Sequence, residues 1–216
     1  MEAIDACLPT NDGIAWFTKL YLRVTEAVNA ELPRATFRDP AFLARLDVVF
    51  ANLYFSALKA YVGDPKRAPR AWAPLFAARR KKRIAPLQFA FAGMNAHINR
   101  DLPVALVATC QQAGIDLLRA RRQHADFVAV NAILERTEAK VKRWFTTGFA
   151  GVVDVALGAE DDRIAIWKVS RARDAAWVNA QTLWALRDVP ALQRRYLDVL
   201  DRTVGFAGRG LLMPLP

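Results

Sequence analysis

Helix start and stop signals recur along the whole sequence and constrain its fold more than any other feature. Asp39 stands before Pro40, the order expected for a capping carboxylate followed by a proline in the first helical turn. An aspartate followed closely by a proline recurs at residues 101–103 and 188–190, and glycine or proline follows most periodic apolar segments. These signals predict helices over residues 12–32, 40–62, 86–99, 101–112, 124–147, 161–186 and 190–204, with a short helix over 69–79.

Strand signals are scarce, and only residues 152–157 have the composition of a short strand or the end of a loop. The 216 residues suit one domain, and no internal repeat divides them. We therefore predict an all-α fold, a single helical domain over residues 1–216 with an orthogonal or bundle-like array of about seven to nine helices. Residues 65–85 form a basic connecting segment in this scheme. Residues 205–216 form an apolar, loop-like C-terminal tail packed on the core.

Positive charge is concentrated in one short segment. The formal net charge is +10, from 31 basic and 21 acidic residues, and residues 65–83 contain eight basic residues and no acid. Two interpretations of this segment stay open. It is either a solvated linker that keeps the protein soluble, or a face for nucleic acid, an anionic surface or an acidic ligand. No sequence motif of a nucleic-acid-binding fold accompanies it.

Several classes of protein are excluded or disfavoured by missing motifs. No apolar run approaches the roughly 18 residues of a membrane span, and the N-terminal pattern is not that of a signal peptide. We therefore expect no transmembrane segment and a cytoplasmic location. The sequence has no nucleotide cofactor motif, because glycine-rich phosphate loops and the dinucleotide fingerprint are absent. With two histidines in the chain, any bound divalent metal would also need carboxylate ligands.

Asp47 is placed by helical periodicity on an apolar face. At about 100° per residue, apolar and aromatic side chains one and two turns away, including Tyr54, surround it, whereas the polar residues of this helix fall opposite. A buried carboxylate needs a partner. Asp47 is therefore either a tie between helices, bonded to backbone or tyrosine groups, or an acid, base or metal ligand of a site.

Arg173 presents a similar conflict between charge and surroundings. Its helical neighbours include Trp177 and Trp184, so the guanidinium projects from an aromatic face. It is predicted to pair with Asp47 inside the protein, or to hold an anionic group of a ligand, for which its planar fork is suited. A third alternative is that the stem extends past the tryptophans and the guanidinium reaches solvent.

Residues 93–101 carry polar side chains on two opposite stripes of one helix. His97 and Asp101 share one stripe, and Asn95 and Asn99 share the other. Because the surrounding segment is strongly apolar, at least one stripe must be buried and satisfied by partners. His97 and Asp101 form either a proton-transfer dyad or two metal ligands. The structural alternative is that Asp101 caps the next helix, His97 is a core histidine, and the asparagines bridge helices rather than orient a ligand.

One stretch has a family resemblance. The sequence PLQFAFAGMNAHINRDL at residues 86–102 resembles the signature of a bacterial family of unknown function. The order of DGIAWF at residues 12–17, HADF at 124–127 and RDAAW at 173–177 is similar to the same family over nearly the whole chain. The resemblance supports a single domain and directs attention to the segment Asn95–Asp101. It implies no activity.

These features predict an enzyme that acts on a small, partly apolar molecule in a pocket between helices. His97, Asp101 and Asp47 would supply acid–base groups or hold a metal. The ligand-binding residues would be Asn95, Asn99, Arg173, Tyr54, Trp177 and Trp184. Two alternatives have different chemistry. One is a binder of an apolar or anionic ligand without turnover, and the other is a nucleic-acid or anionic-surface binder that uses residues 66–83.

Overall fold

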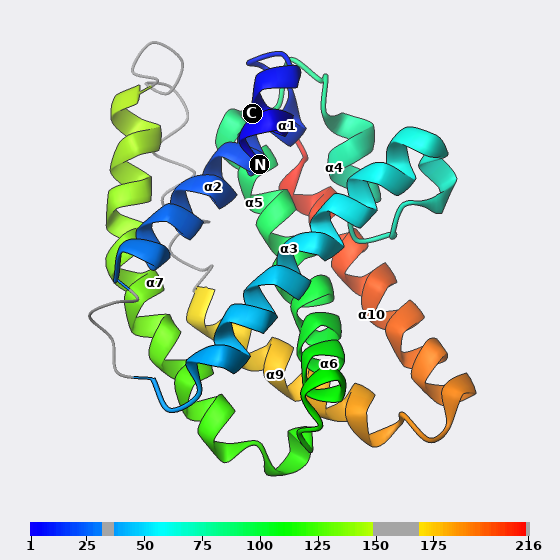
Figure 1. The fold of residues 1–216 in the computed structure, drawn as a ribbon. Coiled ribbons are helices and arrows are strands. Elements are labelled where there is room, and N and C mark those ends of the chain that lie inside the picture. Colours follow the sequence, from blue (N-terminus) through cyan, green and yellow to red (C-terminus); the bar gives the residue numbers. More distant parts are fainter. Residues whose placement is uncertain (32–36, 149–168, 215–216) are drawn as a thin grey trace.

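Helices form every regular element of the described chain, and the prediction of an all-α single domain is confirmed. A computed structural model describes residues 1–31, 37–148 and 169–214 (Figure 1). A π turn (η3, His97–Asp101) and two 3₁₀ turns (η2, Pro65–Arg67; η4, Leu117–Arg119) join the longer elements. The α-helices in these residues are α1 (Glu2–Cys7), α2 (Gly13–Glu31), α3 (Pro40–Gly63), α4 (Ala73–Ala78), α5 (Pro86–Ala96), α6 (Leu102–Ala113), α7 (Arg121–Gly148), α9 (Val169–Ala185) and α10 (Pro190–Leu211).

The predicted capping signals hold at the starts of α2 and α3 but not at α10, where Asp188 makes no capping hydrogen bond. The Asp39 side chain accepts the backbone N–H of Phe42, and Asp12 accepts that of Ile14. Asp12 also binds the guanidinium of Arg79 through Nε at 2.7 Å, so the start of α2 is tied to the end of α4. Within the basic connecting segment, residues 65–85, the predicted short helix is present as α4, and several of its side chains are buried.

Two predicted boundaries are wrong. Asp101 does not cap a new helix, because its side chain accepts no capping hydrogen bond and the chain continues through η3 directly into α6. The C-terminal residues are not loop-like, because α10 continues to Leu211. Gly205 lies where a Cβ would overlap the carbonyl oxygen of Arg70, so this close approach needs glycine. The predicted strand or loop at 152–157 and the start of the helix at 161–168 lie outside the described residues.

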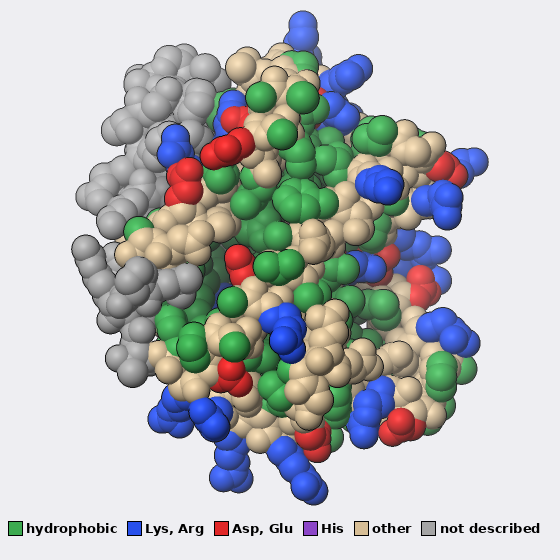
Figure 2. All heavy atoms as spheres, viewed as in Figure 1, with side chains coloured by type: hydrophobic (Ala, Val, Ile, Leu, Met, Phe, Trp, Pro, Cys, Tyr) green, Lys and Arg blue, Asp and Glu red, His purple; other side chains and the backbone are tan. Residues whose placement is uncertain are grey.

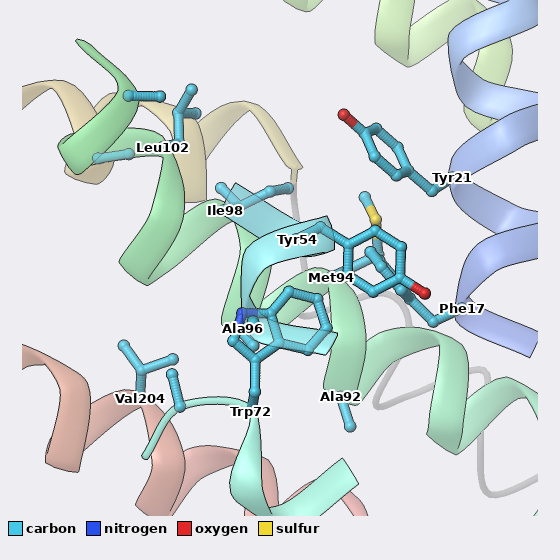
Figure 3. Close-up of a cluster of buried hydrophobic side chains, with 14 of the residues drawn as sticks. Phe17, Tyr21, Tyr54, Trp72, Ala92, Met94, Ala96, Ile98, Leu102 and Val204 are labelled. Atoms are coloured by element: carbon cyan, nitrogen blue, oxygen red, sulfur yellow. The ribbon is translucent and has the colours of Figure 1, made fainter. Parts of the chain in front are cut away.

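The core is centred on α5, which contacts α2 on one side and α10 on another. Gly93 and the alanines of α5 let these neighbours approach, and an aromatic group fills the space between α2, α3 and the start of α4. Figure 3 shows Phe17 and Tyr21 from α2 converging with Tyr54 from α3 and Trp72. All four side chains are buried.

The predicted solvent face of α3 is confirmed, whereas its fully buried face is turned away from the predicted centre at Asp47. Leu46, Tyr54 and Ala57 are buried, whereas Asn52 and Lys59 are exposed. By length and composition this helix is also apolar enough to cross a membrane, with an 18-residue window of mean hydropathy 1.4. Core helices of soluble proteins meet the same two criteria, so the absence of a transmembrane segment stays a prediction.

The contact between α5 and α2 gives a test of the core. A Cβ at Gly93 would overlap the ring of Phe17. Gly93→Ala is expected to lower the free energy of unfolding by about 1–3 kcal/mol, because a packed ring must move. Gly210→Ala is the matched control, since a Cβ there meets no atom within 4 Å and alanine favours the helix by up to about 1 kcal/mol. Urea denaturation measures both, and equal stability of the two variants would contradict the packing described.

Candidate functional site

A π turn positions His97 and Asp101 for direct contact. The backbone N–H of Leu102 donates to the carbonyl of His97, five residues back. The imidazole Nδ1 then lies 3.1 Å from Asp101 Oδ2, and both side chains are buried, with relative exposures of 1% and 0%. Single π turns inside helices occur frequently at functional sites. The 3.1 Å contact shows that the predicted pairing of His97 and Asp101 is present, and their burial places the pair in the core.

Donors surround the Asp101 carboxylate on all sides. The indole Nε1 of Trp72 donates to Oδ2 at 3.0 Å, and the guanidinium of Arg100 donates to Oδ1 at 2.8 Å. Arg100 Nε is 3.3 Å from Asp201 on α10. These positive and dipolar groups stabilise the ionised carboxylate inside the protein. An ionised carboxylate only accepts hydrogen bonds, so the proton of neutral His97 is assigned to Nδ1 and Nε2 is left as an acceptor.

Aromatic rings surround the His97 imidazole. Phe50 stacks on it with ring centroids 3.6 Å apart and an interplanar angle of 7°. The Tyr21 ring approaches edge-on at 4.7 Å. The remaining rings of this shell, with centroids 5.8–6.3 Å from the imidazole, belong to Phe17, Tyr54 and Trp72. We call these five rings the aromatic shell.

The Nε2 atom of His97 is buried without a hydrogen-bond partner among the described residues. Leaving a buried polar atom unsatisfied costs about 1–3 kcal/mol, so such atoms are rare and require an explanation. Burial lowers the pKa of His97 below its usual value, while the charges of Asp101 and Asp47 act in the opposite direction. The imidazole is therefore neutral at pH 7, with a free lone pair on Nε2.

Two further polar groups lie near this imidazole. Asp47 is exposed, which corrects the prediction of a carboxylate buried in the apolar face, because it occupies the outer edge of that face. The surrounding protein still partly desolvates its carboxyl and raises its pKa, and its charge acts on both His97 and Tyr21. Burial is the main cause of the raised pKa of Tyr21. Figure 2 shows this side of the molecule hollowed between α2 and α3, with hydrophobic side chains inside the hollow and an acidic side chain at its edge.

Tyr54 belongs to the aromatic shell, but its hydroxyl is directed elsewhere. It shares a 2.6 Å hydrogen bond with Thr18 Oγ1 on α2. Burial raises the pKa of Tyr54, so the phenol stays protonated. The hydroxyl is thus engaged between α2 and α3, while the ring contributes to the aromatic shell.

Arg173 lies between α7 and α9 and has partners of its own. Its Nε donates to Asn131 Oδ1 at 2.6 Å, and another guanidinium nitrogen donates to the carbonyl of Phe127 at 2.9 Å. The guanidinium also stacks over the Phe127 ring at 4.0 Å. Burial lowers the pKa of Arg173 to about 10, against the effect of Asp174. Asp47 is not one of these partners, so the predicted pairing of the two charges is not formed.

The two predicted tryptophans also lie away from His97. Trp177 packs beside Phe127 and His124 of α7, with ring centroids 5.0 and 4.6 Å away. Phe127 is also the ring over which the Arg173 guanidinium lies. Trp184 lies under the guanidinium of Arg187 at 5.0 Å. The predicted constellation is therefore divided, because Arg173, Trp177 and Trp184 contact other residues than His97 and Asp101.

The asparagine stripe faces α10 instead of the aromatic shell. Asn95 Nδ2 donates to the carbonyl of Val204 at 3.0 Å, and Asn99 donates to Asn95 Oδ1 at 3.1 Å. Gln88, on the same face of α5, donates to the carbonyls of Leu211 and Met213. These side chains therefore bridge α5 and η3 to the C-terminal helix, as expected if the asparagines connect helices rather than orient a ligand.

Sequence reasoning missed several members of the site, including Tyr21, Phe50, Trp72 and Arg100. Only Phe50 carried a local signal, since it lies one turn from Asp47 and Tyr54. The donors of Asp101 come from a different segment. In the described residues, no group of three or more His, Cys, Asp or Glu side chains is placed to hold a metal ion. Donors already occupy both oxygens of Asp101, so the arrangement favours acid–base chemistry over metal binding.

The low pKa of His97 predicts a loss of stability in acid. Below the ordinary histidine pKa of about 6.5, the unfolded chain binds a proton that the folded protein does not. The contribution of neutral His97 to the free energy of unfolding is therefore fully present above that pH. It falls as the pH is lowered toward the pKa of folded His97, by at most about 1.4 kcal/mol per pH unit. Denaturation of His97→Gln at a series of pH values should lack this component.

His124→Gln, which removes the exposed histidine, is the matched control and should keep the wild-type slope. Asp47, whose pKa is raised, acts in the opposite direction at lower pH, so variants are compared at equal pH. Identical slopes for wild type and His97→Gln would contradict a buried neutral imidazole.

Comparisons with known proteins identify the family of the chain. Searches of curated proteins and of solved structures give no match. A family model matches residues 1–214, which is nearly the whole chain. The chain therefore belongs to the Family of unknown function DUF5995.

Proposed function

We propose that the protein is an enzyme in which His97 and Asp101 form an acid–base centre for a small, partly apolar molecule. The observation that carries this proposal is the buried Nε2 atom of His97, which has a free lone pair and no hydrogen-bond partner among the described residues. A substrate O–H, N–H or acidic C–H group is the partner that this atom lacks. The aromatic shell supplies an apolar surrounding for it.

The proposed mechanism uses the pair as a general base. His97 Nε2 accepts a proton from the substrate, and the resulting imidazolium is stabilised through Nδ1–H by the Asp101 carboxylate. Trp72 and Arg100 keep that carboxylate ionised and oriented. The imidazolium returns its proton to the product or to water, which restores the starting state. An orienting carboxylate has the same role in catalytic triads.

A purely structural role accounts for fewer of the contacts. A core histidine would be expected to satisfy both ring nitrogens. Asp101 would be expected to cap α6, and it does not. Its carboxylate instead receives three donors, of which His97 is one. The pair has the arrangement of a poised base.

Access to the imidazole is expected through the side formed by Phe50 and Asp47. Phe50 is half-buried and covers one face of the ring, while Asp47 is exposed near it on the same helix. Movement of the Phe50 side chain is therefore the smallest change that opens the shell. A molecule with an aromatic or aliphatic body fits the rings that remain.

A general-base probe tests this proposal without knowledge of the natural substrate. 5-Nitrobenzisoxazole is small and aromatic, and one base converts it by removing the C3 proton as the N–O bond breaks to give a phenolate. We expect the wild-type protein to accelerate this step, His97→Gln to abolish the acceleration, and Asp101→Asn to reduce it by about 100-fold. The rate should rise with pH through a pKa below 6.5.

His124→Gln, which leaves the centre intact, should react at the wild-type rate. Circular dichroism establishes that each variant is folded. Equal rates for wild type and His97→Gln would refute the acid–base centre. Chemical-shift changes of His97 and Phe50 on adding the probe, without any turnover, would replace it by the alternative of a non-catalytic binder.

A further inference from the structure

Helix α10 has an outward stripe of large apolar side chains. Leu192, Val199 and Phe206 are seven residues apart and are 51%, 55% and 72% exposed. Met213, seven residues further on and just past the helix end, is 62% exposed. A spacing of seven keeps side chains on one side of a helix. The stripe runs for about 21 Å along the helix from Leu192 to Phe206. Figure 1 shows α10 along one side of the molecule.

A row of arginines lies beside this stripe. Arg195, Arg202 and Arg209 are also seven residues apart and exposed, and helical geometry places them next to the apolar row. The Arg209 guanidinium lies 5.7 Å from the Phe206 ring. The acidic residues of α10 are both engaged: Asp198 pairs with Arg202 and Arg70, and Asp201 with Arg100. The outward face of α10 is therefore both apolar and cationic.

The opposite side of α10 is fixed to the core, so the helix is held with this stripe outward. Val204, Gly205 and Gly208 are buried. The Asp201 carboxylate accepts the backbone N–H groups of Arg70 and Ala71. With Gln88 and Asn95 bound to its carbonyls as described above, rotation of α10 would break all of these contacts.

We propose that the outward face of α10 docks on an anionic lipid bilayer. Phe206, Met213 and Val199 would enter the boundary between headgroups and acyl chains, while the arginines extend to the phosphates. The exposed residues Lys66 and Arg67, which precede the segment bound to Asp201, add to the positive field. Each basic residue near an anionic surface strengthens binding by about fivefold. This proposal does not depend on the acid–base centre.

Two other occupants of the stripe fit less well. Nucleic acid would neutralise the arginines but would leave four large apolar side chains without an apolar surface. In an antiparallel pair of α10 helices from two copies, the arginine rows would face each other. The net charge of +10 also opposes self-association.

Vesicle co-sedimentation tests the proposal on the full-length chain. The probes are vesicles of phosphatidylcholine alone and vesicles containing one-third phosphatidylglycerol. We expect binding to the anionic vesicles that weakens with added salt, and little binding to the neutral ones. Val199→Ser/Phe206→Ser and, separately, Arg195→Gln/Arg202→Gln/Arg209→Gln should each weaken binding at least tenfold.

Matched controls distinguish binding by this face from non-specific adsorption through other apolar side chains and from binding by the basic segment. Val48→Ser/Val62→Ser removes exposed apolar side chains from α3, and Arg80→Gln/Lys81→Gln/Lys82→Gln removes charge from the segment after α4. Both control variants should keep at least half of the wild-type affinity. Absence of binding to anionic vesicles, or α10 variants that bind like wild type, would overturn the proposal. Light scattering that finds a dimer abolished by Val199→Ser/Phe206→Ser would assign the stripe to a second copy instead.

Discussion

The carboxylate of Asp101 is removed from water, and much of the fold is arranged around its negative charge. A buried charge is tolerated only where donors replace its hydration. The π turn brings His97 back to it, the segment before α4 brings Trp72, and Arg100 extends from it to Asp201 on α10. Elements distant in sequence are thereby held in one relative position. Substitution of any one donor would leave the others around an incompletely neutralised charge.

The same network separates two roles among the polar residues of α5 and η3. One side of this helical segment points to the aromatic shell and carries the pair His97–Asp101. The other side carries Gln88 and Asn95, which donate to backbone carbonyls of the C-terminal helix, and Asn99, which donates to the Asn95 side chain. Both sides are therefore polar for a physical reason. The second side fixes the position of α10, and the first leaves His97 Nε2 without a hydrogen-bond partner among the described residues.

Local sequence signals predicted the helices and the solvent face of α3. The surroundings of individual polar residues depend on contacts between distant segments, which those signals do not contain. A cap such as Asp39 depends on neighbouring residues and can be recognised in the sequence. Asp101 before Pro103 has the same local appearance, but Trp72 and Arg100 provide its partners and no capping bond forms. Periodicity placed Asp47 in the middle of the apolar face, which is wrong because the residue is exposed. It could not show that this position lies at the exposed edge of that face.

Long-range partners also explain why the predicted constellation was too large. The pairing of Arg173 with Asn131 depends on the packing of α9 against α7, which one sequence does not reveal. His97 and Asp101 were predictable because they are four residues apart. Phe50 and Tyr21 come from two other helices, and only the three-dimensional structure brings them to the imidazole.

The Asp201 carboxylate accepts the backbone N–H groups of Arg70 and Ala71, and these contacts can form only late in protein synthesis. Trp72, the indole donor to Asp101, follows these two residues directly, and the segment that carries it is fixed by a carboxylate about 130 positions later in the chain. During synthesis on the ribosome, α2 to α6 emerge long before that carboxylate. The His97–Asp101 pair therefore reaches its final geometry only after α10 is released and docks, so a chain shortened before α10 would have this pair without its full support.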